Sequence, residues 1–160
     1  MADVTTGIGF DAHRFGGPGP LRLAGVVVDV GRGLDATSDG DVAVHAVMDA
    51  MLGAAALGDI GTHFPSDDPR WRGADSMQLL ALVHAMVADT GLRLLHVDLT
   101  IVSESVRVAP HREAMRTALA HALGLGVGAV SVKASTTDGM GWTGRDEGVA
   151  ALAVATLDQA

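Results

Sequence analysis

The strongest structural signal in the chain is a helical pattern that begins at Ser38 and ends near Gly58. Small and apolar residues recur there at intervals of three and four, which is the spacing of one helix face. Ser38, followed three residues later by Asp41, has the form of a capping box, so we expect the helix to begin at Ser38. A helix with such a stripe must bury it against other elements of the same core.

The rest of the chain carries both strand and helix patterns. Segment 149–157 fits either a helix or a buried strand, because its alanines favour one and its length allows the other. Segment 59–75 has two prolines and no periodicity, which predicts a functional loop. The mixture predicts one α+β domain over residues 1–160. We expect strands at 4–10, 96–103 and 130–133, a hairpin or extended stretch at 21–30, and helices at 76–90 and 110–123.

Composition narrows the classes of function. The net charge of −8, from 11 basic and 19 acidic residues, lacks the basic footprint of a nucleic-acid binder, so we expect no nucleic-acid partner. There is no cysteine, so a metal site must use His and carboxylate ligands. The first residues lack a signal-peptide pattern, and no apolar run reaches the length of a membrane span. We therefore expect a cytoplasmic protein without a membrane partner.

Asp11, His13 and His45 are candidate metal ligands. Asp11 and His13 are two residues apart at the end of an expected strand, so both side chains leave the same face. With His45 from the following helix they form a three-ligand set for Zn²⁺ that leaves a fourth position for a substrate oxygen. Helix capping and ordinary hydrogen bonding are the alternative explanation of this pattern.

Two carboxylates flank His45 on its own helix face. Asp41 and Asp49 lie four residues either side of it. A ligating imidazole usually donates its second N–H to a carboxylate or a carbonyl, which is a role that either residue can fill. The alternative is a solvated acidic stripe.

A second polar cluster follows the expected strand at 130–133. Hydroxyl groups, glycines that free backbone N–H groups, and a nearby Arg together form a plausible diphosphate cradle. A Thr- and Gly-rich turn between two strands is the alternative. Asp138 is in addition a candidate ligand for Mg²⁺. The cluster comprises Lys133, Ser135, Thr136, Thr137, Asp138, Gly139, Gly141, Gly144 and Arg145.

Four segments together resemble the 2-C-methyl-D-erythritol 2,4-cyclodiphosphate synthase family. They are GFDAHRF (9–15), SDGDVAVHAVMDAMLGAAALGDIG (38–61), FPSDDPRWRGADS (64–76) and KASTTDGMGWTGRDEG (133–148). The resemblance implies a homotrimer in which a four-stranded mixed sheet faces the threefold axis and helices pack outside. It also implies a strand at 149–157, and active sites between neighbouring subunits.

The implied reaction converts 4-diphosphocytidyl-2-C-methyl-D-erythritol 2-phosphate to the cyclic 2,4-diphosphate and CMP, in the non-mevalonate isoprenoid pathway. The 2-phosphate of the substrate attacks its own β-phosphorus, so the protein supplies positioning and charge neutralisation. The resemblance also implies an axial cavity that can take an isoprenoid diphosphate.

The resemblance implies a role for each matched position. Asp11, His13 and His45 hold Zn²⁺, and Asp138 faces a Mg²⁺ or Mn²⁺ that bridges the substrate diphosphate. Thr136 contacts the transition state, with Ser135, Thr137 and Arg145 around it. The erythritol portion and the substrate loop correspond to Ser38, Asp59, Ile60, Gly61, Phe64, Pro65, Ser66, Asp67 and Asp68. The cytidine pocket corresponds to two segments of the adjacent subunit, Lys133 to Asp138 and the residues Ser103, Glu104, Ser105, Val106, Arg107, Val108 and Ala109.

The chain departs from the family pattern at three places. Thr37 stands where most members have a His with a phosphate-contacting, transition-state role. The segment around Arg107 lacks the usual preceding proline. Trp142 replaces a smaller Phe or Leu and borders the nucleotide pocket or the axial cavity.

Two other functions compete with cyclisation. The same ligands are suited to a zinc-dependent hydrolase of nucleotide diphosphates, in which a bound water attacks. A trimeric binding module that takes an isoprenoid diphosphate without turnover is the second alternative.

Overall fold

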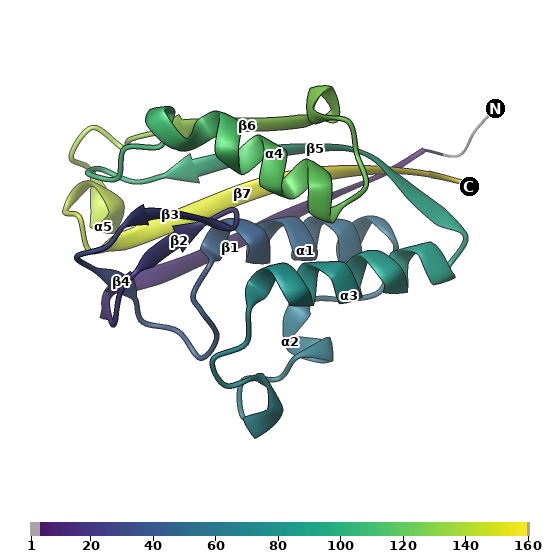
Figure 1. Cartoon of the computed structure of the whole chain (residues 1–160), viewed down its shortest axis with the longest axis horizontal. Helices are drawn as coiled ribbons and strands as arrows, with labels where there is room; N and C mark the ends of the chain where they lie inside the picture. The colour runs from purple at the N-terminus through teal and green to yellow at the C-terminus, as the bar shows by residue number, and fades with distance from the viewer. Residues whose placement is uncertain (1–3, 160) are drawn as a thin grey trace.

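A computed structural model describes residues 4–159, and its centre is a mixed sheet of five strands in the order β4-β1-β7-β5-β6 (Figure 1). β1 pairs antiparallel with β7, β7 antiparallel with β5, and β5 parallel with β6. A separate two-stranded hairpin is formed by β2 and β3. The bounds are β1 Thr5–Gly17, β2 Leu21–Leu23, β3 Val26–Asp29, β4 Gly33–Leu34, β5 Leu92–Val102, β6 Val130–Ser135 and β7 Gly148–Gln159.

The helices cover one face of the sheet. α1 packs against β1 and β7, α3 lies beside α1, and α4 packs on β6 (Figure 1). Almost every residue of α1 is buried, so this helix forms the centre of the core. The helical bounds are α1 Val42–Ala54, α2 Ile60–His63, η1 Pro69–Trp71, α3 Ser76–Asp89, η2 Ala109–His111, α4 Arg112–Ala122, η3 Val127–Ala129 and α5 Gly141–Gly144.

Two glycines on β1 allow α1 to approach the sheet closely. A Cβ atom added to Gly9 would lie 1.9 Å from the carbonyl oxygen of Ala46, and one added to Gly7 would lie 2.1 Å from that of Ala50. Any side chain at either glycine would therefore overlap the helix backbone. The lack of side chains at these positions sets the distance between strand and helix.

The residue that caps α1 lies three positions later than the capping-box pattern predicted. Asp41, and not Ser38, caps the helix by accepting a hydrogen bond from the backbone N–H of Val44. The same carboxylate accepts from the backbone N–H groups of Ala24 and Gly25 at 2.8 and 2.7 Å. Asp41 is fully buried, and these three donors compensate its desolvation. The helix start is thereby attached to the β2–β3 turn.

Some of the other predicted helices and strands are confirmed, and others differ from the structure. The helix at 76–90 and the hairpin at 21–30 are confirmed, and segment 149–157 is a strand inside β7. The sheet has five strands instead of four, because the two-residue β4 pairs with β1. β1 continues past Phe10 to Gly17, so the expected strand end was wrong. Segment 59–75 contains two short helices, α2 and η1, where we expected only a loop.

The face of the sheet turned away from α1 exposes apolar side chains. Ile8 and Phe10 on β1 are 70% and 57% exposed, and Leu152 of β7 is 38% exposed. Phe10 and Leu152 are directly paired across the two strands. An apolar patch of this kind on a sheet is typical of a surface that another protein surface covers. Within residues 4–159, no helix combines the length and apolar character needed to span a bilayer.

Candidate metal centre and substrate pocket

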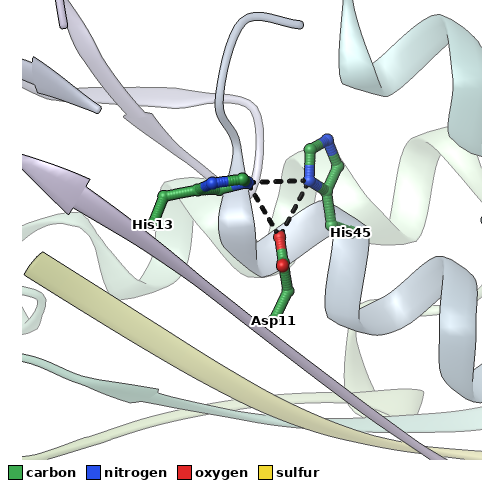
Figure 2. Close-up of side chains that lie close together, drawn as sticks. All are labelled: Asp11, His13 and His45. Atoms are coloured by element: carbon green, nitrogen blue, oxygen red, sulfur yellow. Dashed lines mark hydrogen bonds and ion pairs between the residues drawn. The ribbon is translucent and has the colours of Figure 1, made fainter. Parts of the chain in front are cut away.

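Asp11, His13 and His45, here called the metal triad, meet between β1 and α1 (Figure 2). Oδ2 of Asp11 lies 3.0 Å from Nε2 of His13 and 2.9 Å from Nδ1 of His45, and the two ring nitrogens are 3.4 Å apart. Asp11 and His13 share a strand face, and His45 lies in the first turns of α1. The predicted cluster therefore forms, although in the middle of β1 and not at its end.

The donor set fits a zinc ion. One carboxylate oxygen and two imidazole nitrogens converge, and Zn²⁺ in enzymes is commonly held by three such ligands with a fourth position left for substrate. The side chains are only 9–22% exposed, so the ligands are held by the surrounding packing. Rigid elements on both sides preset their spacing.

The ring of His45 is oriented by hydroxyl groups and not by the carboxylates on its own helix. Its Nε2 lies 3.0 Å from Oγ of Ser76 and 3.2 Å from Oγ of Ser38. The expected roles of Asp41 and Asp49 in orienting His45 are wrong, because both carboxylates are used elsewhere. Asp41 caps α1, and Asp49 accepts a hydrogen bond from the backbone N–H of Ile60 at 2.8 Å.

The charges of the triad reinforce one another. Burial acts to raise the pKa of Asp11, but hydrogen bonds from His13 and His45, together with their charges, hold it well below its usual range. Burial acts to lower the pKa of His45, but the hydrogen bond to Asp11 and the nearby charges of Asp11, Asp41 and Asp39 raise it overall. Asp11 is thus ionised at neutral pH. Its negative charge stabilises the protonated, positively charged form of the His45 imidazole.

A cavity of about 220 Å³ opens beside the triad. Of the residues expected to bind substrate, several line it together with Asp11, His13 and His45: Thr37, Ser38, Ile60, Gly61, Phe64 and Ser66. Asp59 caps α2 through the backbone N–H of Thr62 and is exposed, while Asp68 pairs with Arg70. Pro65, Asp67 and Asp68 belong to the same segment without lining the cavity.

Sequence patterns missed other parts of this pocket. Trp71 lines it and contacts Phe64 edge-on, with ring centroids 5.0 Å apart. Nε1 of Trp71 is buried and has no hydrogen-bond partner among residues 4–159. Met48 and Leu79 also line the cavity, and the sequence patterns had not singled out either residue. A Trp within a non-periodic loop was the available signal, because such a residue needs a packing partner.

The second polar cluster lies on an exposed turn, here called the threonine turn (residues 135–145), which contains α5. Oγ1 of Thr136 is 3.3 Å from Oδ1 of Asp138, and Oγ1 of Thr137 lies 2.9 Å from that of Thr143. Arg145 pairs with Glu147 at 2.6 Å. Asp138 adopts a positive φ of 52°. The turn is thus organised by its own hydrogen bonds, with Thr136 and Asp138 open to solvent.

The segment expected to bind cytidine lies against this turn. The backbone N–H of Ser103 donates to the carbonyl of Ser135 at 3.1 Å, and Oγ of Ser105 donates to Asp146 at 2.6 Å. Arg32 joins them by donating to Ser105 and Asp146. Lys133 instead pairs with Asp98 on the neighbouring strand at 2.6 Å, so its expected cytidine contact stays a prediction.

A second hollow, of about 360 Å³, also borders His13. Its walls include Arg14, Trp142 and Glu147. His13 borders both this hollow and the cavity beside the triad, so the two spaces adjoin at a metal ligand. Arg14 lines the second hollow and not the cavity that Thr37 lines.

The fold and the site define a class: a mixed-sheet α+β domain whose central strand and helix bring an Asp-His-His cluster to the edge of a pocket. Residues 4–158 match the YgbB family. The chain belongs to that family.

Similar proteins agree with this membership. The chain is 51% identical over 158 residues to a 2-C-methyl-D-erythritol 2,4-cyclodiphosphate synthase of Alcanivorax borkumensis. The aligned region covers 99% of each protein. It is 51% identical to the bifunctional enzyme IspD/IspF of Novosphingobium aromaticivorans, of which it spans 39%. A solved 2C-methyl-D-erythritol-2,4-cyclodiphosphate synthase in a CDP-bound form superposes with a TM-score of 0.87 at 37% identity, covering 96% of this chain and 99% of that one.

Proposed function

We propose that this chain converts 4-diphosphocytidyl-2-C-methyl-D-erythritol 2-phosphate to 2-C-methyl-D-erythritol 2,4-cyclodiphosphate and CMP. One observation carries the proposal: the metal triad opens into a cavity lined by Thr37, Ser38, Ile60 and Gly61, in a chain 51% identical over 158 residues to a synthase of this name. The cavity places hydroxyl and backbone groups next to a three-ligand metal site, as an anionic substrate requires.

The reaction needs no protein nucleophile. The substrate 2-phosphate attacks the β-phosphorus, the bond from that phosphorus to the bridging oxygen breaks, and CMP leaves. The protein must therefore hold the two phosphates in line and offset their charge. Asp11, His13 and His45 would hold Zn²⁺, which when bound supplies a Lewis acid that orients the attacking phosphate and polarises the phosphorus. Thr37 and Ser38 offer neutral hydroxyl donors at the cavity wall.

The erythritol portion binds along the segment that begins at Asp59. Ile60 and Gly61 line the cavity, and the Asp49 carboxylate holds this segment through the backbone N–H of Ile60. Asp49 is half-buried, and burial raises the pKa of its carboxyl group. Residues 64–68 close over the sugar in this proposal, with Phe64 and Ser66 facing it.

The threonine turn supplies the other half of the site. Thr136 contacts the transferring phosphoryl group, and Ser135, Thr137 and Arg145 surround it. Asp138 would hold a Mg²⁺ or Mn²⁺, which neutralises charge on the diphosphate when bound. The cytidine rests on residues 103–109 and 133–138 of the neighbouring copy, and within each chain these two segments lie against each other through the Ser103–Ser135 hydrogen bond. The CDP-bound solved structure supports a cytidine nucleotide as ligand.

The working assembly in this proposal is a homotrimer whose sheets face a common axis. Ile8, Phe10 and Leu152 form an apolar patch on the face opposite α1, which a second and third copy would cover. Each metal triad would then receive the threonine turn of a neighbouring copy. Trp142 and His13 both line the second hollow. An isoprenoid diphosphate is the proposed occupant of a cavity on the trimer axis.

The test is product analysis with purified protein and the cytidine diphosphate substrate, with and without Zn²⁺ and Mg²⁺. Cyclic diphosphate and CMP in equal amounts are expected. CMP with a linear bisphosphate would identify a hydrolase instead. Binding of a prenyl diphosphate without CMP release at any metal concentration would identify a binding module.

The same assay with Thr37→His measures what the departure at position 37 costs. A Thr hydroxyl donates one neutral hydrogen bond, whereas an imidazolium adds a positive charge beside the phosphates. We expect a rise in turnover of at least about tenfold, in the range that one positioned donor contributes. Unchanged turnover would mean that the reaction of this chain does not depend on a cation at position 37.

A further inference from the structure

Ser76 is a buried hydroxyl that no part of the proposed reaction uses. It is the first residue of α3, has no exposed surface, and lies 3.0 Å from Nε2 of His45. This nitrogen is on the opposite side of the ring from Nδ1, which faces Asp11 at 2.9 Å. Ser76 therefore contacts a metal ligand from behind.

The proton of this hydroxyl is committed to a carboxylate. Oγ of Ser76 donates to Oδ1 of Asp39, and the backbone N–H of Ser76 donates to Oδ2 of Asp39 at 3.0 Å. A serine hydroxyl has one proton and two acceptor lone pairs. Its contact with His45 is therefore one in which Nε2–H donates and Oγ accepts, so Nδ1, which faces Asp11, is the nitrogen that a metal would bind after displacing its proton.

Ser76 and Asp39 also connect residues 64–75, which contribute to the cavity wall, to the metal triad. The backbone N–H of Asp39 donates to the carbonyl of Ala74 at 3.0 Å, and that of Gly73 donates to the carbonyl of Thr37 at 2.8 Å. Residues 37–39 and 73–76 are thus fastened side by side. The segment that carries Phe64, Ser66 and Trp71 is held at its C-terminal end by these hydrogen bonds.

We propose that Ser76 and Asp39 are positioning residues for the metal: together they hold His45 as the Nε2–H tautomer and tie the end of the 64–75 segment to that ligand. Outer partners of this kind fix the ring orientation and raise the basicity of a ligating imidazole. The inference rests on the metal site proposed above.

The test compares zinc affinity by competition with a chromophoric chelator for wild type, Ser76→Ala, Asp39→Asn and Asp11→Ala. Ser131→Ala, which removes a part-buried hydroxyl from β6 away from the pocket, is the matched control. We expect Ser76→Ala to bind zinc about 10–100-fold more weakly and Asp39→Asn to fall between it and wild type. The melting temperatures of the zinc-free Ser76→Ala and Ser131→Ala proteins should drop by similar amounts, which separates positioning from a general loss of stability.

A measurement on the unaltered protein guards against a variant that fails to fold. Histidine NMR of the zinc-loaded wild type should show Nε2–H and a metal-bound Nδ1 at His45, with the signal assigned by its loss in His45→Asn. Wild-type zinc affinity in Ser76→Ala, or a metal-bound Nε2, would overturn the positioning role while leaving the metal site intact. Equal, weak binding by wild type and Asp11→Ala would instead overturn the metal site and this inference with it.

Discussion

The metal triad and the threonine turn contribute to one proposed site, and they differ in how a single chain builds them. The triad side chains are at most 22% exposed and are held by β1, α1 and the hydroxyl groups behind His45. Thr136 and Asp138 are open to solvent and are bonded mainly to each other. A buried half is preorganised by packing, whereas an exposed half can be completed by another copy of the chain.

This difference assigns different duties to the two halves. Side chains fixed by a packed core present their donor atoms at set spacings, which a metal requires. A turn held by local hydrogen bonds can adjust to a bound diphosphate and its counter-ion. Substitutions in the buried half should therefore affect metal binding and folding, while those in the exposed half should affect turnover alone.

The largest effect is expected from Asp11→Ala. Removing one of three ligands should weaken zinc binding by more than the roughly 10–100-fold typical of outer partners, and should abolish measurable CMP release. Metal analysis after dialysis and the product assay check this. Asp89→Ala, at the exposed end of α3, serves as the control and should keep both properties. Full zinc content in Asp11→Ala would remove Asp11 from the metal site.

Thr136→Ala tests the exposed half. Loss of one donor to the transition state should reduce turnover about 100-fold, with unchanged zinc content and unchanged melting temperature. Thr117→Ala on the surface of α4 is the matched control. If the Thr136 variant loses zinc as well, the two halves are not separable in the way the structure indicates.

Asp41→Ala should show that the buried half depends on packing. The carboxylate caps α1 and holds the β2–β3 turn through three backbone donors. Its loss leaves those donors buried without a partner, at a cost of about 2–3 kcal/mol of unfolding free energy. Denaturant unfolding measures this. Asp138→Asn in the threonine turn should change stability by less than about 0.5 kcal/mol, and a larger change there would blur the distinction.

The smallest effect is a pH dependence confined to the triad. A raised pKa of His45 means that its contribution to the stability of the metal-free fold is complete below 6.5 and is lost as pH rises through the raised value. The lowered pKa of Asp11 means that its contribution is present above 3.8 and is lost as pH falls through the lowered value. The metal-free protein should be most stable at mildly acidic pH.

Zinc binding should have the opposite trend, because the metal must displace the proton of His45. Affinity should fall up to about tenfold per pH unit below the raised pKa, as one displaced proton requires. Chelator competition between pH 5.5 and 8 measures this slope. A flat profile would show that His45 is already neutral without the metal.

Much of the buried half could be predicted from residue order. The two-residue spacing of Asp11 and His13 placed both on one strand face, and helical spacing located α1 and α3. β7 could not be distinguished from a helix, because it lies inside the sheet between β1 and β5 and its residues are apolar on both faces. Family resemblance supplied that strand.

The partners of His45 lay outside any local pattern. Ser76 and Asp39 are 37 residues apart, and only the packing of α3 beside α1 brings them together. Asp41 and Asp49 had the right spacing on the helix, but backbone N–H groups from other segments occupy them. Helical spacing identifies which residues share a face and not which buried donors compete for them.

The glycines at positions 7 and 9 affect the spacing of the metal ligands, although neither glycine is itself a ligand. A methyl group at Gly9 would overlap the carbonyl oxygen of Ala46, the residue next to His45. A chain that keeps Asp11, His13 and His45 but replaces either glycine would carry all three donors at the wrong separation. The presence of the three ligands in a related sequence is therefore not a sufficient test of whether that protein binds metal. The test must also ask whether glycine is present at the positions that match Gly7 and Gly9.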